Sequence, residues 1–120
     1  MSTHLQRATK LARTIATFSS CTRDQVGAVI ITTEGELIIG WNGTPAGSLN
    51  CDKGGCTRSR SDCPSGSAPL PDESCLHAER NCLIWAGAKS RGATLVVTRA
   101  PCNQCTLMIT QCKIDKVEVV

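Results

Sequence analysis

The feature that most constrains this chain is a His-x-Glu motif followed, later in the sequence, by a Pro-Cys-x-x-Cys motif. One imidazole and two thiolates are good ligands for Zn²⁺, and three protein ligands leave the fourth tetrahedral position open for a water. A carboxyl group beside such a metal suits a proton shuttle. We therefore expect His77, Cys102 and Cys105 to hold a catalytic zinc ion and Glu79 to move protons.

The spacing within each motif predicts that both lie at the start of a helix. Cys102 and Cys105 are three residues apart and so share one helix face, and Pro101 suits a first turn because no backbone donor is lost there. His77 and Glu79 do not share a helix face, so both reach one site only within a first turn. The positive end of a helix dipole also favours thiolates. The sequence thus predicts two helix N-termini that point at one metal.

Neither motif alone is sufficient to predict a catalytic zinc site. A single His-x-Glu carries almost no information, and a Cys-x-x-Cys in a reducing compartment can be a redox pair or half of a structural zinc site. The combination in this order, with a proline before the first cysteine, is typical of mononuclear zinc deaminases.

Composition argues for one globular domain and against nucleic-acid binding. The chain has 120 residues, 41% of them hydrophobic, which we interpret as a single domain over residues 1–120. The net charge is only +3, and aromatic residues make up 2%, whereas single-strand binders stack bases on exposed rings. We expect no signal peptide, no membrane span and a cytoplasmic location. In that compartment the nine cysteines are metal ligands or packing groups, not disulfides.

Hydrophobic periodicity predicts an α/β fold. An amphipathic helix precedes a strand hairpin, and a strand-helix-strand unit ends the chain as a right-handed parallel pair. We expect a three-layer α-β-α architecture with a mixed sheet, in which an antiparallel hairpin is followed by parallel strands. The expected helices are 3–18, 77–89 and 102–112, and the expected strands are 26–31, 37–41, 93–98 and 116–120.

Two polar segments carry further candidates. Asn42 opens a loop that runs to Gly47, and its amide suits a sugar hydroxyl or, equally, the backbone of its own turn. Residues 48–74 form a long aperiodic segment, which in a compact domain is usually functional or tied down. A second, structural zinc with four thiolate ligands would tie it down, free thiols being the alternative. The candidate ligands are Cys21, Cys51, Cys56, Cys63 and Cys75.

From position 20 to position 120 the chain resembles the deoxycytidylate (dCMP) deaminase family of the cytidine-deaminase-like fold. The runs that carry the resemblance are 20–29, 40–47, 77–81 and 101–105. The first two are specific to the deoxycytidylate branch, and the last two are shared by many deaminases. The family usually has Tyr where this chain has Trp41, so we expect some repacking of the pocket there.

The resemblance implies a role for each matching residue. His77, Cys102 and Cys105 would hold the catalytic zinc, with Glu79 as the proton shuttle. The substrate contacts that it implies are Asn42 to the deoxyribose, the backbone N–H of Ala78 to the base carbonyl, and Arg23 near the phosphate. Phage and bacterial members carry a second zinc. Its ligands there fall on Cys21, Cys51 and Cys75, with Cys56 matching a further bacterial cysteine and Cys63 in reserve.

The implied reaction is hydrolytic deamination of dCMP to dUMP with release of ammonia, which feeds dTMP synthesis. Family members are commonly hexamers that dCTP activates and dTTP inhibits, so we expect a homo-oligomer, a hexamer or a dimer, and these effectors. Relatives continue past the position of Val120 through a further strand and helix. If this protein ends there, substrate recognition can be borrowed from a neighbouring subunit or can differ.

Three alternatives stay open at this point. The substrate can be another cytosine nucleotide, dCTP or a 5-modified dCMP. A tRNA or free-nucleoside deaminase is the second alternative, although a tRNA enzyme should carry a more basic surface. The third is a non-catalytic zinc-binding regulatory module, which would have no chemical need for Glu79.

Overall fold

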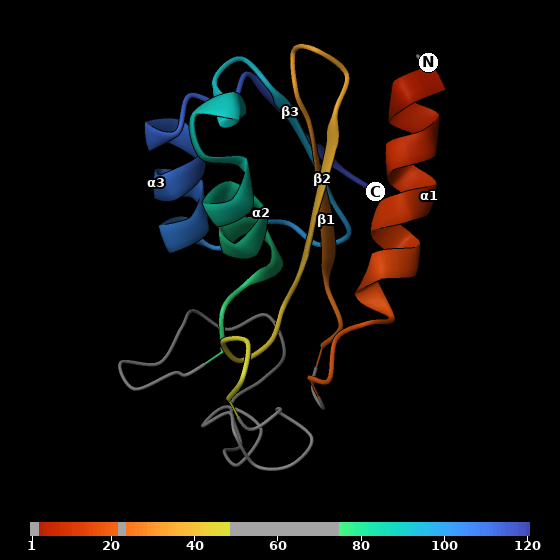
Figure 1. The fold of residues 1–120 in the computed structure, drawn as a ribbon, viewed down its shortest axis with the longest axis vertical. Helices are drawn as coiled ribbons and strands as arrows, with labels where there is room; N and C mark the ends of the chain where they lie inside the picture. Colours follow the sequence, from red (N-terminus) through yellow and green to blue (C-terminus); the bar gives the residue numbers. More distant parts are fainter. Residues whose placement is uncertain (1–2, 22–23, 49–74) are drawn as a thin grey trace.

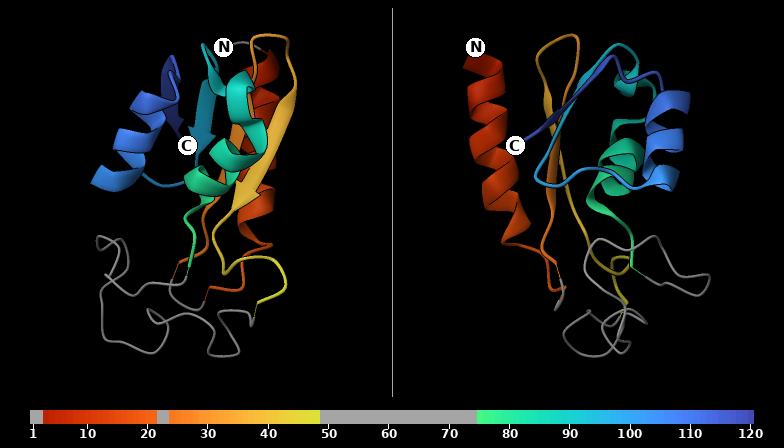
Figure 2. Two further views of the ribbon diagram at one scale, coloured as in Figure 1. Left: turned by 60° about the vertical axis from the view of Figure 1, so that its left-hand side comes forward. Right: turned by 180° about the vertical axis from the view of Figure 1, so that it is seen from behind.

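The computed structural model describes residues 3–21, 24–48 and 75–120, which form three layers with a sheet in the middle (Figure 1). The sheet consists of β1 (Gly27–Ile31), β2 (Leu37–Trp41), β3 (Thr94–Val97) and β4 (Lys116–Val119). Helix α1 (Thr3–Ala16) covers one face, and α2 (Ala78–Ala86) and α3 (Asn103–Gln111) cover the other, as the two views of Figure 2 show. The predicted α-β-α layering is confirmed.

The sheet is mixed, as the sequence predicts, and its strand order is β2-β1-β3-β4. Strand β1 is antiparallel to both β2 and β3, and β3 is parallel to β4 through the crossover helix α3. Three of the strands, β2, β3 and β4, therefore run in the same direction. The loops that follow β2 and β3 therefore lie at the same end of the sheet, beyond the carboxyl ends of these strands. Functional sites of α/β proteins usually lie at this end.

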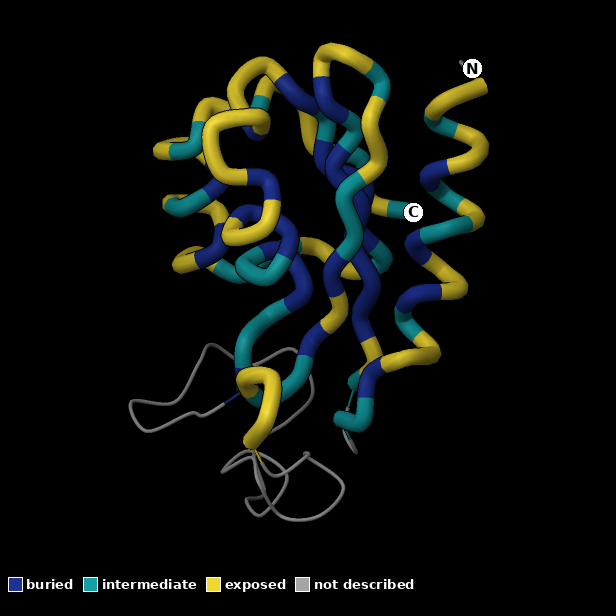
Figure 3. The backbone as a smooth tube through the Cα atoms, in the orientation of Figure 1, coloured by how far each residue is buried: buried dark blue, intermediate teal, exposed yellow. Residues whose placement is uncertain are grey.

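The central strands bury both of their faces. Val29 and Val96 are cross-strand partners that pack against α1, while Ile30 and Leu95 form the next pair and pack against α2 and α3. This alternation follows from the two-residue period of a strand. Figure 3 shows the buried residues concentrated in β1, β3 and the inner faces of the helices.

Two glycines let helices approach the sheet closely. A Cβ at Gly27 would overlap the backbone of Ala12 in α1. A Cβ at Gly40 would lie 2.7 Å from the Ala78 oxygen and from the Cys82 nitrogen in α2. These two contacts set the distance of each helix from the β1–β2 hairpin. For α2, the contact with Gly40 also sets the distance between the sheet and the start of the helix, which follows His77.

The helices are shorter than the periodicity predicts. The prediction of one helix over 77–89 is wrong, because α2 ends at Ala86 and a 3-10 helix, η3 (Gly87–Ser90), follows. Gly87 has a positive φ of 56° with ψ −131°, a backbone conformation outside the α-helical region that suits glycine. Helix α1 likewise ends at Ala16 and not at Phe18.

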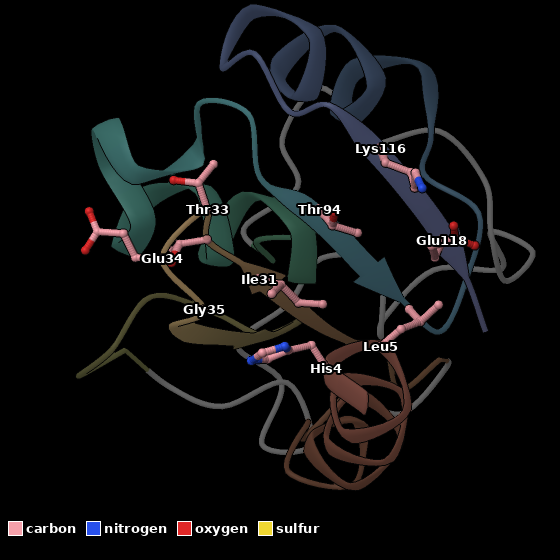
Figure 4. Close-up of a pocket in the computed structure, with 10 residues that line it drawn as sticks. His4, Leu5, Ile31, Thr33, Glu34, Gly35, Thr94, Lys116 and Glu118 are labelled. Carbon is pink, nitrogen blue, oxygen red and sulfur yellow. The ribbon is translucent and has the colours of Figure 1, made fainter. Parts of the chain in front are cut away.

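A groove of about 360 Å³ lies between α1 and the sheet, away from the edge where β2 and β3 end (Figure 4). His4 and Leu5 of α1 line one side, with Ile31, Thr94 and Lys116 among the sheet residues. None of the residues that line it is a candidate metal ligand. Among the described residues, no helix is both long enough and apolar enough to cross a membrane.

Candidate metal centre

Three predicted ligands converge in the structure. His77, Cys102 and Cys105 place their ligand atoms within 4.8 Å of one another. The Nδ1 atom of His77 lies 3.3 Å from the Cys105 sulfur and 3.7 Å from the Cys102 sulfur. The imidazole nitrogen that faces the sulfurs is therefore Nδ1.

Both helices present their N-termini to this cluster. His77 is the N-cap residue of α2, and Cys102 is the N-cap residue of α3. The Cys102 sulfur accepts a 3.5 Å hydrogen bond from the Cys105 N–H, as an N-cap side chain does. Pro101 lies one residue before this cap, so it precedes the first turn that the sequence predicts it to join.

Backbone pairing fixes the position of His77. Leu76 and Gly43 exchange two backbone hydrogen bonds of 2.7 and 3.0 Å, which tie the residue before His77 to the segment after β2. The Asn81 side chain, one turn into α2, donates a 2.7 Å hydrogen bond to the Trp41 carbonyl. The start of α2 is thus attached to the end of β2 at two points.

The segment that leads to the cysteines is attached to the sheet in a similar way. Gly27 donates its N–H to the Thr98 hydroxyl at 3.1 Å, and the Thr98 N–H donates to the Gly27 carbonyl at 3.0 Å. Arg99 forms an ion pair with Asp24 in the segment before β1. These contacts hold the end of β3, and with it the entry to α3, against the start of β1.

Glu79 lies in the first turn of α2 and is 4% exposed. Burial raises the pKa of its carboxyl group above the usual range. Hydrogen bonds from its own backbone N–H and from the Cys105 side chain, and the charge of Arg80, act in the opposite direction. A buried carboxyl with a raised pKa, close to a metal ligand, has the properties of a proton-transfer group.

The donor set fits zinc. Zn–S bonds of about 2.3 Å and Zn–N bonds of about 2.0–2.1 Å place neighbouring tetrahedral ligand atoms roughly 3.6 Å apart, close to the two separations observed. Burial, and then the negative charge of Glu79, raise the pKa of the Cys105 thiol. A cation at this point would reverse that effect, because a coordinating thiol is deprotonated. Two sulfurs and one imidazole nitrogen are the ligands that zinc prefers.

Comparison with known protein families gives a match over nearly the whole chain. Residues 2–120 match the family described as the cytidine and deoxycytidylate deaminase zinc-binding region. The chain belongs to this deaminase family. A zinc ion is therefore the cofactor that both the family and the His/Cys/Cys cluster support.

Individual relatives lie in the deoxycytidylate branch of the deaminase family. A deoxycytidylate deaminase of Schizosaccharomyces pombe is 38% identical over 90% of this chain, which spans 34% of that relative's length. A deoxycytidylate deaminase of Mycobacterium phage D29 is 34% identical, with 89% of this chain and 86% of the relative covered. The crystal structure of dCMP deaminase from cyanophage S-TIM5 with dCMP and dUMP superposes with a TM-score of 0.72. The two sequences are 34% identical, and the match covers 98% of this chain and 81% of the cyanophage chain.

Asn42 has a structural role in the deaminase fold. Its Oδ1 accepts a 2.9 Å hydrogen bond from the Val26 N–H, and its Nδ2 donates to the Asp24 carbonyl at 2.7 Å. Its own carbonyl accepts a 2.7 Å hydrogen bond from the Ser19 hydroxyl. The side chain is buried and satisfies the backbone before β1, and not the backbone of its own turn. Contact with a sugar stays a prediction.

The remaining predicted site residues divide into two groups. Ala78 is the first residue of α2, where a backbone N–H has no partner inside the helix. Cys21 and Cys75 pack against each other at one end of the fold. The other candidates lie outside the described residues: Arg23, Cys51, Cys56 and Cys63.

Two residues beside the metal centre, Arg80 and Gln104, have no role predicted by the sequence motifs. Arg80 donates a 2.8 Å hydrogen bond from Nη2 to Oε1 of Gln104 and so joins α2 to α3. Their positions in the sequence could have indicated them, because Arg80 directly follows Glu79 and Gln104 lies between the two cysteines. Polar residues inside a motif are easily treated as spacers when only the ligands have an expected chemistry.

Proposed function

We propose that residues 1–120 act as one zinc-dependent deaminase domain that converts dCMP and water into dUMP and ammonia. The observation that carries this proposal is the convergence of His77, Cys102 and Cys105 beside the buried carboxyl of Glu79. The deoxycytidylate deaminases among the relatives, and the sequence runs at 20–29 and 40–47, support dCMP over other cytosine substrates.

In this proposal, different residues bind the metal, transfer protons and hold the base. His77, Cys102 and Cys105 would hold zinc, which when bound supplies a Lewis acid and lowers the pKa of water in the open fourth position to about 7. Glu79 would accept one proton from the water and deliver it to N3 of the ring. It would then accept the second proton from the oxygen newly bonded to C4 and deliver it to the departing amine. The Ala78 N–H would hold the base carbonyl by a hydrogen bond. The C4–N bond breaks, a C4–O bond forms, and no redox step occurs.

A substrate panel tests the proposal directly. Ammonia release is measured from dCMP, dCTP, deoxycytidine and 5-substituted dCMP with the zinc-loaded protein. The proposal expects dCMP to have the highest kcat/KM. Preference for another nucleotide would reassign the substrate within the same reaction. No turnover of any of the four, with zinc shown to be present, would favour a non-catalytic zinc-binding module.

The proposal extends to a second zinc ion at Cys21, Cys51, Cys56 and Cys75, with Cys63 in reserve. The contact between Cys21 and Cys75 supports it, because two thiolates of a four-sulfur site must lie close together. Metal analysis of the purified protein tests it: two zinc ions per chain are expected, falling to one in Cys75→Ser. One zinc ion in the unmodified chain would contradict the second site.

We also propose that the protein is a homo-oligomer, a hexamer in preference to a dimer, that responds to dCTP and dTTP. Trp85 and Ile84 on α2 are 75% and 58% exposed, and large exposed apolar side chains suit a subunit contact. A cavity of about 460 Å³ adjoins them and is lined by residues 43–47. Sedimentation tests the oligomeric state, and ammonia release from dCMP with and without each nucleotide tests the response. A monomer whose activity neither nucleotide changes would contradict them.

A further inference from the structure

One polar contact joins the two helices that carry the candidate metal ligands. Arg80 in α2 donates to Gln104 in α3 at 2.8 Å. Arg80 immediately follows Glu79, and Gln104 immediately precedes Cys105. Each partner is therefore one residue away from a group of the metal centre, on opposite helices.

The spacing of these helices decides the geometry of the centre. His77 caps α2, whereas both cysteines belong to the first turn of α3, so the nitrogen-to-sulfur distances change whenever one helix shifts against the other. Helix α2 packs mainly on β1 and β2, and its contact with α3 is less extensive. A metal site needs its ligands held within about 0.5 Å of the productive geometry.

The Arg80 side chain is partly buried and makes one hydrogen bond to the neighbouring helix. Its Nε atom is inaccessible to solvent and has no hydrogen-bond partner among the described residues. The guanidinium is planar and rigid, so a single well-placed acceptor restricts the whole group. Gln104 is exposed, so the contact lies on the solvent side of the two helices.

We propose that Arg80 and Gln104 form a clamp that fixes the spacing of α2 and α3 and thereby slows the release of zinc. Arg80 is a positioning residue in this proposal, since it acts through the helix ends and not by contact with substrate. The inference rests on the zinc site of the proposed function and is independent of which nucleotide is deaminated.

The test measures zinc release from the zinc-loaded full chain into a coloured chelator. Loss of a residue that orients metal ligands typically costs 10- to 100-fold in affinity, so Arg80→Met and Gln104→Leu are each expected to release zinc about tenfold faster. Because both remove the same contact, the double variant should release it no faster than either single variant. Lys89→Met is the control, since it breaks an exposed ion pair with Glu36 away from the centre.

A conservative variant separates the clamp from a general loss of structure. Gln104→Glu keeps an acceptor for Arg80 and should release zinc no faster than the unmodified chain. Release from Gln104→Glu as fast as from Gln104→Leu would overturn the clamp, as would multiplying effects in the double variant or unchanged rates in all variants. An unmodified chain that binds no zinc would overturn the proposed function itself.

Discussion

His77 and Cys102 are the N-cap residues of two different helices, and the imidazole Nδ1 of one lies 3.7 Å from the sulfur of the other. A metal ligand at an N-cap lies beyond the end of the helix, next to the unpaired N–H groups of the first turn. Two such ends meeting at one point create a region that favours negative charge. Thiolates and a carboxylate can therefore be concentrated there when a cation is also present.

Replacement of Glu79 by Gln should separate metal binding from turnover. The amide has nearly the same shape but cannot carry a proton between water and base, and such groups contribute about 10²- to 10⁴-fold. We expect Glu79→Gln to retain its zinc content and to lose at least about 100-fold in kcat. Metal analysis and ammonia release check both parts, and turnover close to that of the unmodified protein would refute the role of Glu79.

Two cysteines of the same region provide a matched pair for the metal ligands. Cys102→Ser removes a sulfur of the cluster, while Cys112→Ser changes the C-cap residue of α3. Loss of a direct ligand should weaken zinc binding more than about 100-fold, since changes behind the ligands already cost 10- to 100-fold. Zinc affinity is measured by chelator competition. Equal losses in the two variants would show that the effect comes from the fold of α3.

The close approach of α2 to β2 predicts that Gly40→Ala destabilises the protein. The added methyl would lie 2.7 Å from two backbone atoms of α2, and overpacking of this kind costs about 1–3 kcal/mol. That cost exceeds the roughly 0.5–1 kcal/mol that alanine usually gains over glycine in a strand. Gly43→Ala is the control, because no described atom lies within 4 Å of the added methyl. Denaturant unfolding of both variants decides the matter, and similar stabilities would contradict the prediction.

Asn42→Ala is expected mainly to lower the stability of the protein, and not to weaken substrate binding directly. It leaves the buried Val26 N–H and the Asp24 carbonyl without their observed partner, at about 1–3 kcal/mol for each unsatisfied group. With two groups left unsatisfied, we expect the free energy of unfolding to fall by about 2–6 kcal/mol. An unchanged unfolding midpoint with a raised KM for dCMP would instead assign this asparagine to the sugar.

Cys82 should be an unreactive thiol with a pH-dependent contribution to stability. Its sulfur is buried and lies 3.2 Å from the Ala28 carbonyl, to which it donates. Burial, and then the charge of Glu79, raise its pKa above the usual thiol value of 9.0. A raised pKa in the folded state means that this contribution is complete below pH 9.0 and is lost as the pH rises above it.

Alkylation of the native protein, with peptide mapping by mass spectrometry, checks the prediction for Cys82. The half-buried Cys112 serves as the internal control and should react first. Modification of both thiols at the same rate would show that α2 opens easily. Unfolding midpoints measured across pH 9.0 for Cys82→Ala and the unmodified chain test the pH dependence, and the difference between them should shrink or reverse as the pH rises.

The sequence by itself determined the α/β class, the approximate element boundaries and the group of side chains that meets at the edge of the sheet. These follow from local rules: the period of the hydrophobic residues, the turn residues and the spacing of Cys102 and Cys105 within one helical turn. For Asn42 the sequence offered a sugar contact or the backbone of its own turn, and it did not indicate the backbone of Asp24 and Val26 that the side chain contacts.

Only the tertiary structure decided how separate segments meet. The antiparallel pairing of β1 with β3, the burial of Asn42 against Val26 and the contact of Arg80 with Gln104 each join residues far apart in the chain. No local period encodes such contacts, because they depend on how the packed layers bring the segments together. Likewise α2 stops at Ala86, since the backbone of Gly87 adopts a positive φ before the apolar pattern ends.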